Sequence, residues 1–325
     1  MKVAVTGATG FVGAAVVKGY AGRVGCSVIA VTRRLPVEPL PGVAYLALGE
    51  LGAGRPWHAD LEGVDVLIHT AARVHVMNDS AADPLAAFRA VNVAGTLELA
   101  SRAAAAGVKR FVFISSVKVN GELTRLGSKF NEADAPLPQD PYGVSKCEAE
   151  LGLRQIALET SMEVVIIRPP LVYGPGVKAN FAALMRAVQR GIPLPLGAIH
   201  NQRSLVALDN LVDFSITCAV HPQAANQTFL VSDGEDLSTT ELVRKMAAAA
   251  GVPSRLVPVP AWALRLGAGL LGKGDAVQRL CGNLQVDISK ARALLGWVPP
   301  LSVDEGLQLA MGRGGDGLPR PSGSH

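Results

Sequence analysis

Short apolar runs alternate with alanine-rich segments along the first half of the chain, and this alternation limits the fold more than any other feature. Parallel strands need a crossover, usually a helix, so such alternation predicts a parallel sheet covered on both faces. We therefore predict an α/β fold with a doubly wound, Rossmann-type parallel sheet. The strand-like runs are VAVTG at 3–7, SVIAVTR at 27–33, VDVLIHTAA at 64–72, RFVFISS at 110–116 and EVVIIRPP at 163–170, and helical patterns cover 84–106 and 143–160.

The first of these runs leads through a glycine-rich turn, VTGATGFVG, into a helical pattern. Gly7 is suited to the tight turn, Gly10 to close approach of the backbone to a pyrophosphate, and Gly13 to packing of the helix on the strand. Phe11 and Val12 open the helix, whose N-terminal NH groups favour phosphate. Between a strand and a helix this spacing predicts a dinucleotide site, and a plain tight turn is the alternative.

The second strand-like run ends in Thr32, Arg33 and Arg34. A chain that binds NAD in this way carries an acidic residue here, on the ribose hydroxyls. An acidic side chain would repel the extra 2′-phosphate of NADP, whereas two guanidinium groups attract it. We therefore predict NADP(H), with NAD(H) as the alternative if both arginines only face solvent.

Tyr142 and Lys146 begin a helical pattern with the spacing Tyr-x-x-x-Lys, which places both on one helix face. A phenol is a poor acid–base group at neutral pH, but an ammonium group and a nicotinamide cation favour its phenolate. Ser116 follows a strand-like run and is expected to hold the substrate carbonyl oxygen. The spacing alone also occurs by chance, so the prediction of catalysis depends on the glycine turn and the serine in the same chain.

After Pro170 the pattern becomes irregular and rich in proline and glycine. We predict an NADP(H)-binding Rossmann domain at 1–170 that includes the catalytic residues. Residues 171–311 are expected to form mainly a smaller substrate-binding cap, with some segments returning to the sheet, and 312–325 a disordered tail. The cap contains helical patterns near 180–190, 209–220, 238–250 and 302–310.

Charge and cysteine content exclude several functions. The net charge of +4 comes from scattered lysines and arginines, so no basic tract predicts nucleic acid binding. The four cysteines form no CxxC and no His-Cys cluster, which predicts reduced thiols and no structural metal.

The apolar segment 261–271 is too short to span a bilayer and contains an arginine, although contact with a membrane surface stays open. No signal peptide pattern follows Met1, so we expect a cytoplasmic protein.

Short motifs are spread over nearly the whole chain: TGATGFVG at 6–13, IHTAA at 68–72, NVAGT at 92–96, FISS at 113–116, YGVSK at 142–146, RPPLVYGPG at 168–176, RSLVALDNLVD at 203–213 and VDISKARALLGW at 286–297. Together they resemble the extended short-chain dehydrogenase/reductase family, in its nucleotide-sugar epimerase, dehydratase and reductase branch. The resemblance implies that Ser116 is the catalytic hydroxyl, Tyr142 the acid–base tyrosine and Lys146 its lysine, which also orients the cofactor ribose.

The resemblance implies further cofactor contacts. Glu50 and Leu51 match residues that meet the adenine. Ala71 and Ala72 match the turn beside the cofactor phosphates, and Pro169 is expected near the nicotinamide.

On the substrate side, the resemblance implies that the cap holds a nucleoside diphosphate. Asn180 matches the start of a cap helix, Leu194 a position beside the base, and Arg203 a pyrophosphate ligand with a fork of donors. Arg279 is a weaker candidate for a second phosphate arginine. Arg73, which opens the stretch RVHVMND, is also expected to contact the substrate.

The stretch SSVKVNGE places Lys118 two residues after Ser116. In the family's 4,6-dehydratases an Asp and a Glu stand at the positions of Val117 and Lys118, so elimination chemistry is excluded here. Lys118 is either a substrate contact or a solvated rim residue. SSVKVNGE and RVHVMND together resemble bacterial enzymes that reduce UDP-4-keto-6-deoxy-N-acetylhexosamines for lipopolysaccharide O-antigen assembly.

We therefore predict an NADPH-dependent 4-keto reductase of a UDP-linked 6-deoxy amino sugar. An NAD-dependent UDP-hexose or UDP-N-acetylhexosamine 4-epimerase is the alternative, disfavoured by Arg33 and Arg34. Pro170, where many epimerases carry an asparagine, is a further departure. A sterol- or flavonoid-type dehydrogenase is disfavoured by Arg203, and a non-catalytic NADP(H)-sensing protein by the intact Ser, Tyr and Lys set. Relatives pair two helices across a two-fold axis, which predicts a homodimer.

Overall fold

The structure is a computed structural model of the chain, and it describes residues 1–47, 49, 61–74, 83–270 and 274–312. Three sequence predictions lie outside these residues. They are the adenine contacts Glu50 and Leu51, most of the stretch RVHVMND, and the tail from residue 313 onward.

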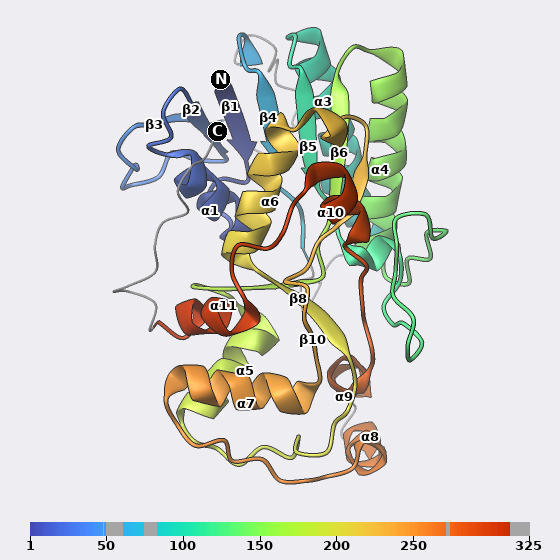
Figure 1. Cartoon of the computed structure of the whole chain (residues 1–325). Coiled ribbons are helices and arrows are strands. Elements are labelled where there is room, and N and C mark those ends of the chain that lie inside the picture. The colour runs from blue at the N-terminus through green and yellow to red at the C-terminus, as the bar shows by residue number, and fades with distance from the viewer. Residues whose placement is uncertain (48, 50–60, 75–82, 271–273, 313–325) are drawn as a thin grey trace.

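A seven-stranded parallel sheet forms the centre of the molecule, and it confirms the predicted doubly wound α/β fold (Figure 1). Its strand order is β3-β2-β1-β4-β5-β6-β9, and every pair of neighbours is parallel. All carboxyl ends therefore meet at one edge. The strands are β1 (Lys2–Thr6), β2 (Ser27–Thr32), β3 (Val43–Ala47), β4 (Val66–His69), β5 (Arg110–Ile114), β6 (Glu163–Arg168) and β9 (Thr228–Leu230).

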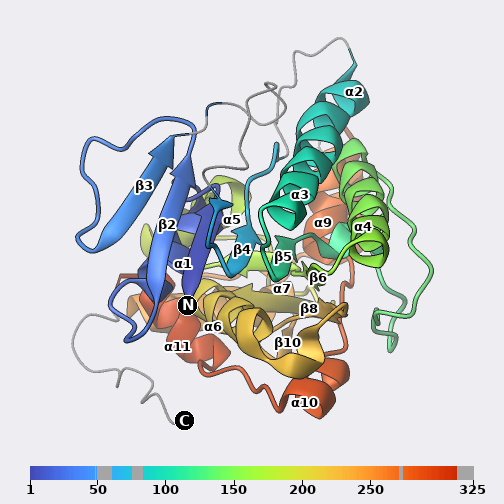
Figure 2. The same cartoon turned by 90° about the horizontal axis from the view of Figure 1, so that it is seen from above.

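Alternate residues of each strand pack into two separate cores, because successive side chains point to opposite sheet faces. Val112 of β5 packs with α1 (Phe11–Tyr20) and α6 (Leu208–Val220), whereas Phe111 packs with α3 (Thr96–Ala105) and α4 (Pro141–Glu159). Figure 2 shows α3 and α4 together on one face and α1 with α6 on the other.

The predicted helix over 84–106 is present, but it contains a π-helical segment. It consists of α2 (Pro84–Phe88), η2 (Arg89–Gly95) and α3. The wider turns of a π-helix are rare in proteins, but those that occur are often found at functional sites. Periodicity of apolar residues does not distinguish it from an α-helix, so the sequence could not predict it.

The remaining elements lie mainly below the carboxyl edge of the sheet, where a third core joins several helices to a small three-stranded sheet of order β10-β8-β7 (Figure 1). Although α6 and β9 belong to the second half of the chain, they pack on the large sheet; the domain boundary at 170 stays a prediction. The elements other than those of the large sheet and its covering helices are β7 (Leu171–Tyr173), β8 (Arg203–Ala207), β10 (Asp236–Leu237), α5 (Ala179–Gln189), α7 (Thr239–Ala250), α8 (Ala261–Leu270), α9 (Gly274–Cys281), α10 (Ser289–Leu295) and α11 (Val303–Ala310), with short 3-10 turns η3 (Val117–Val119) and η4 (Pro222–Ala224).

The helices predicted near 180–190, 209–220, 238–250 and 302–310 correspond to α5, α6, α7 and α11. Within the described residues, no helix combines the length and the apolar character that crossing a bilayer requires.

Candidate active site

The glycine turn after β1 is built too tightly for any other residue at two of its positions. Gly7 has φ +70°, and a Cβ there would lie 2.7 Å from the backbone nitrogen of Ala71. A Cβ on Gly13 would lie 2.2 Å from the carbonyl oxygen of Gly7. The turn therefore packs directly against the chain after β4, and Gly10 begins α1 as its N-cap. Phe11 and Val12 follow as its first residues, half-buried.

This cradle fits the phosphates of a dinucleotide. It presents the N-terminus of a helix of ten residues at the carboxyl edge of the sheet, where ligands of doubly wound folds bind. Ala71 lies against this turn, and Ala71 and Ala72 are both half-buried; their contact with the cofactor phosphates stays a prediction.

The end of β2 offers a buried polar atom without a partner. Thr32 is 5% exposed, and its hydroxyl makes no hydrogen bond to any residue that the structure describes. Arg33 and Arg34 follow it and are exposed. A ligand hydroxyl or phosphate at this point would satisfy the threonine and meet the two guanidinium groups.

Ser116, Tyr142 and Lys146 lie just beyond the carboxyl ends of the central strands. Ser116 caps the turn η3 after β5, where its Oγ accepts a bond of 3.2 Å from the backbone nitrogen of Lys118. Tyr142 and Lys146 lie in the first two turns of α4, and the Lys146 ammonium is 6.0 Å from the centre of the Tyr142 ring. Lys146 Nζ also donates to the carbonyl oxygen of Ile114 at 2.8 Å. The end of β5 thus fixes both the serine and the lysine.

Burial sets the protonation of this pair. Tyr142 keeps part of its surface exposed, yet desolvation raises the pKa of its phenol above the ordinary value, and the Asp140 carboxylate raises it further. Burial lowers the pKa of Lys146 to about 7, against the opposing charge of Glu150. In the protein alone the tyrosine is therefore a phenol, and the lysine loses or gains its proton near neutral pH.

A buried ion pair locks the catalytic helix to the sheet. The carboxylate of Glu150, one turn after Lys146, accepts bidentate hydrogen bonds from Arg168 of β6 at 2.9 and 2.6 Å. It also accepts a hydrogen bond of 2.6 Å from the Ser115 hydroxyl. Removal of one partner would leave a buried charge, which typically costs about 3–5 kcal/mol. Sequence reasoning missed both residues as parts of the site.

Asn92 of the π-helical segment is a second residue that sequence reasoning did not assign. Its Oδ1 accepts a hydrogen bond of 2.8 Å from the backbone nitrogen of Arg73. Its Nδ2 donates to the carbonyl oxygen of Arg73 at 3.0 Å and to Ser145 of α4 at 3.0 Å. It thereby joins the chain that follows Ala72 to the helix of Tyr142. The motif NVAGT was the only indication of it in the sequence.

The structure brings together the two predicted phosphate arginines. Arg203 at the start of β8 donates from Nη1 to the carbonyl oxygen of Arg279 at 2.8 Å, and burial lowers the pKa of Arg203. Arg279 is exposed at the end of α9. Asn180 is exposed at the start of α5, and Leu194 is half-buried in a backbone bridge to Leu256.

Of the remaining predicted contacts, Arg73 approaches Tyr142 through Phe88, and Pro169 and Lys118 belong to the surroundings of the turn η3. The guanidinium of Arg73 lies 5.5 Å from the centre of the Phe88 ring, which in turn meets the Tyr142 ring edge-on at 6.1 Å. Pro169 is buried, and its carbonyl oxygen accepts a bond of 3.0 Å from Val117. Lys118 does not stand alone at the rim, because its ammonium contacts Asp140 and Glu122.

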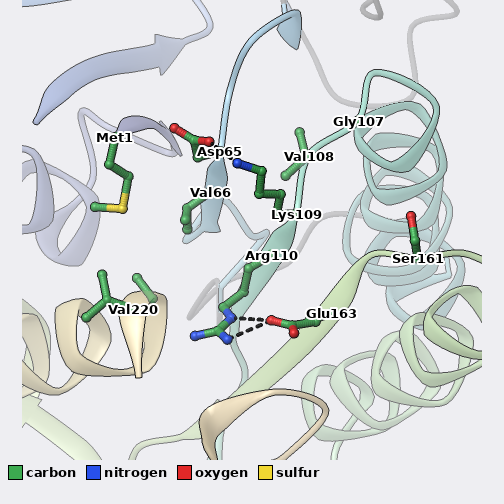
Figure 3. A pocket seen from close by; sticks show the side chains of 11 residues that line it. Met1, Asp65, Val66, Gly107, Val108, Lys109, Arg110, Ser161, Glu163 and Val220 are labelled. Carbon is green, nitrogen blue, oxygen red and sulfur yellow. Dashed lines mark hydrogen bonds and ion pairs between the residues drawn. The ribbon is translucent and has the colours of Figure 1, made fainter. Parts of the chain in front are cut away.

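A cavity of about 780 Å³ opens at the opposite, amino-terminal edge of the sheet (Figure 3). Its charged side chains satisfy one another: Lys109 donates to Asp65 at 2.8 Å, and Arg110 pairs with Glu163 at 2.6 Å. None of the predicted site residues lines it. The candidate active site is therefore at the carboxyl edge, where both the glycine turn and the Ser, Tyr and Lys set lie.

Comparison with known proteins agrees with this geometry. Residues 3–232 match the NAD dependent epimerase/dehydratase family. A UDP-glucose 4-epimerase of Vibrio cholerae is 50% identical over 308 residues, which are 94% of this chain and 93% of that protein. The chain belongs to the NAD-dependent epimerase/dehydratase family.

Solved structures of this family share the fold. A UDP-glucose 4-epimerase of Thermotoga maritima, crystallised with UDP-glucose, has a TM-score of 0.77 at 24% identity, over 96% of this chain and 98% of that one. MoeE5 in complex with UDP-glucose and NAD has a TM-score of 0.76 at 25% identity, with the same coverage.

Family membership makes this protein an enzyme of the nucleotide-sugar epimerase and dehydratase type and supports a nicotinamide cofactor. The similarity to the Vibrio cholerae protein favours our alternative, a 4-epimerase, over the 4-keto reductase that we placed first.

Proposed function

We propose that the protein is a UDP-hexose 4-epimerase. The observation that carries the proposal is a Tyr142–Lys146 pair at the same sheet edge as the glycine turn, in a chain that is 50% identical to a UDP-glucose 4-epimerase. Val117 and Lys118 stand where elimination would need carboxyl groups, so the same site offers no acid and base for a 4,6-dehydratase.

The mechanism assigns each side chain one task. A nicotinamide cofactor, its pyrophosphate held by the glycine turn, would supply reversible hydride transfer at C4 of the sugar. Tyr142 takes the proton from the C4 hydroxyl and returns it to the C4 oxygen after the sugar has turned in the pocket. Ser116 holds that oxygen by a hydrogen bond, and the Lys146 cation favours the phenolate over the phenol. Arg203 and Arg279, which are in contact with each other, would bind the diphosphate.

A second candidate is the NADPH-dependent 4-keto reductase of a UDP-linked 6-deoxy amino sugar, in lipopolysaccharide O-antigen synthesis. One observation favours it: the unsatisfied Thr32 hydroxyl is followed by two exposed arginines, which suit a 2′-phosphate. The same Ser, Tyr and Lys set would serve it, with Tyr142 as proton donor.

One assay separates the two candidates. The purified protein is given UDP-glucose or UDP-N-acetylglucosamine, and the sugar product and the absorbance of reduced nicotinamide are followed together. We expect formation of the C4 epimer without net change of cofactor. Stoichiometric loss of NADPH with a UDP-4-keto-6-deoxy-N-acetylhexosamine, and no epimer, would favour the reductase and refute the epimerase.

A matched pair of variants tests the site in that assay. Tyr142→Phe removes the acid–base hydroxyl, and we expect the rate to fall about 100-fold or more. Lys109→Met changes an exposed lysine at the far edge of the sheet and should leave the rate unchanged. Near-normal turnover by Tyr142→Phe would contradict the assignment of the active site.

A further inference from the structure

Lys118 contacts two carboxylates, although it follows the catalytic serine by only two residues. Its Nζ donates to Asp140 and, at 3.3 Å, to Glu122, and 28% of its side chain is exposed. The backbone of Lys118 is equally close to α4, because a Cβ on Gly143 would lie 3.0 Å from the Lys118 carbonyl oxygen. The turn η3 and the first turn of the catalytic helix are therefore in direct contact.

Asp140 is the residue that begins the catalytic helix. Its Oδ1 accepts a bond of 2.7 Å from the backbone nitrogen of Gly143, in the N-cap arrangement, and Pro141 follows as the first helical residue. An N-cap bond of this kind is typically worth about 1 kcal/mol. The other oxygen, Oδ2, is the one that contacts Lys118. Tyr142 lies only two residues beyond this carboxylate.

A carboxylate so close to the acid–base tyrosine has a cost. Epimerisation requires Tyr142 to become a phenolate, and a neighbouring negative charge opposes this change. Burial raises the pKa of Tyr142, and the Asp140 carboxylate raises it further. An ammonium group bound to Asp140 Oδ2 offsets the negative charge of the carboxylate, while Oδ1 still caps the helix.

We propose that Lys118 serves the reaction indirectly: it holds and neutralises the Asp140 carboxylate that caps the helix of Tyr142. It is then a positioning residue and not a substrate contact. This inference rests on the proposed function, since it takes Tyr142 as the acid–base group.

The other charged groups around Tyr142 come from several elements. Lys146 lies on the same helix, and Arg73 approaches through the Phe88 ring from the chain after β4. Glu122 shares Lys118 with Asp140. On the side of α4 that faces η2, Arg89 and Glu148 are paired at 2.5 Å. Glu122 loses its lysine when Lys118 is replaced, whereas we expect the other groups to keep their places when Lys118 or Asp140 is replaced by a neutral residue.

The test is a double-mutant cycle of Lys118 and Asp140, in which the pH dependence of kcat is measured for each variant. Lys118→Met removes the cation, and Asp140→Asn removes the carboxylate while keeping a residue that caps helices well. We expect Lys118→Met to move the acid limb of kcat to higher pH by about one unit, and so to lower kcat about tenfold on that limb. Asp140→Asn should move it the other way. The double variant should return close to the profile of the parent enzyme, because it carries neither the carboxylate nor the cation.

Controls separate this role from two others. Lys118→Arg keeps the charge and should stay within about twofold of the parent enzyme, and Lys109→Met should have no effect. A rise in the Michaelis constant with an unchanged pH profile would make Lys118 a substrate contact and overturn the inference. A double variant no better than Lys118→Met would overturn it as well.

Absence of epimerase turnover in the parent enzyme would refute the proposed function instead. The inference would still be tested by the tyrosinate absorbance of each protein, measured against the same protein with Tyr142→Phe. The four tyrosines of the chain make that difference readable. Lys118→Met should require higher pH for ionisation of Tyr142, and no change would contradict the inference.

Discussion

We expect Arg33 and Arg34 to set which nicotinamide cofactor the enzyme prefers. Both are exposed and follow the buried Thr32, whose hydroxyl has no partner among the residues that the structure describes. We expect Arg33→Ala with Arg34→Ala to weaken NADPH binding about tenfold or more, because hydrogen bonds to a charged phosphate are lost, and to change NADH binding little. Calorimetric titration of each cofactor measures this without turnover.

The control for that pair is a change at a similar exposed arginine away from the sheet edge, such as Arg190→Ala at the end of α5. Equal weakening of both cofactors, or of neither, would show that the two arginines only face solvent. An enzyme that recycles its cofactor would then use NAD, as the epimerase proposal allows.

Single residues were predictable where a short motif fixes the local chain, and not where the partner is distant in sequence. The spacing of Tyr142 and Lys146 requires only one helix. The Arg168–Glu150 pair joins a strand to a helix, and Asn92 reaches a residue 53 positions away. No local pattern encodes such contacts. Lys118 shows the same limit, because its meaning depends on Asp140, 22 positions further on.

At the scale of elements, the buried side chain of His69 connects strand β4 to strand β1 and helix α3. His69 ends β4, its Nδ1 lies 2.6 Å from the Thr6 hydroxyl of β1, and its Nε2 lies 3.0 Å from the Thr96 hydroxyl of α3. Burial lowers the pKa of His69 from 6.5 to about 3, with a smaller contribution from Lys146. The folded protein therefore requires the neutral ring.

The sign of the pH dependence follows. Stability from the neutral ring is fully present above pH 6.5 and is lost as the pH falls toward 3, because the unfolded chain takes up the proton first. Each pH unit in that window should cost about 1.4 kcal/mol. Urea unfolding at pH 6.5 and 4.5 measures it, with His69→Gln as the control that cannot titrate. Equal acid sensitivity of the two proteins would contradict this assignment.

Elements of the first half were predictable because apolar runs and alanine-rich segments alternate regularly. The cap was harder. Its strands β7 and β10 have only three and two residues, too few for a pattern of alternation. Helices α8 to α10 were missed, since the glycines and short lengths of that region hide helical periodicity.

At the scale of the whole molecule, one surface predicts how two copies associate. The helix α4 exposes Leu151 and Leu158, at 58% and 83%, and their spacing of seven residues places them on one side of the helix. Lys146 and Glu150, on a different side of the helix, are buried toward the sheet. Figure 2 shows α3 beside α4 on this outer face. Two such pairs related by a two-fold axis would form a four-helix bundle that covers the exposed leucines.

We therefore expect a homodimer of twice 33.7 kDa in light scattering at micromolar concentration. Leu158→Glu places a charge in the proposed interface and should shift the mass toward the monomer, because an unpaired charge is costly to bury. Leu126→Glu changes a leucine that is 77% exposed in a loop outside α4, and it should leave the dimer intact. Since α4 also carries Tyr142, loss of the dimer should lower activity along with mass. A monomeric parent protein, or dissociation by both variants alike, would show that this face of α4 is not the interface.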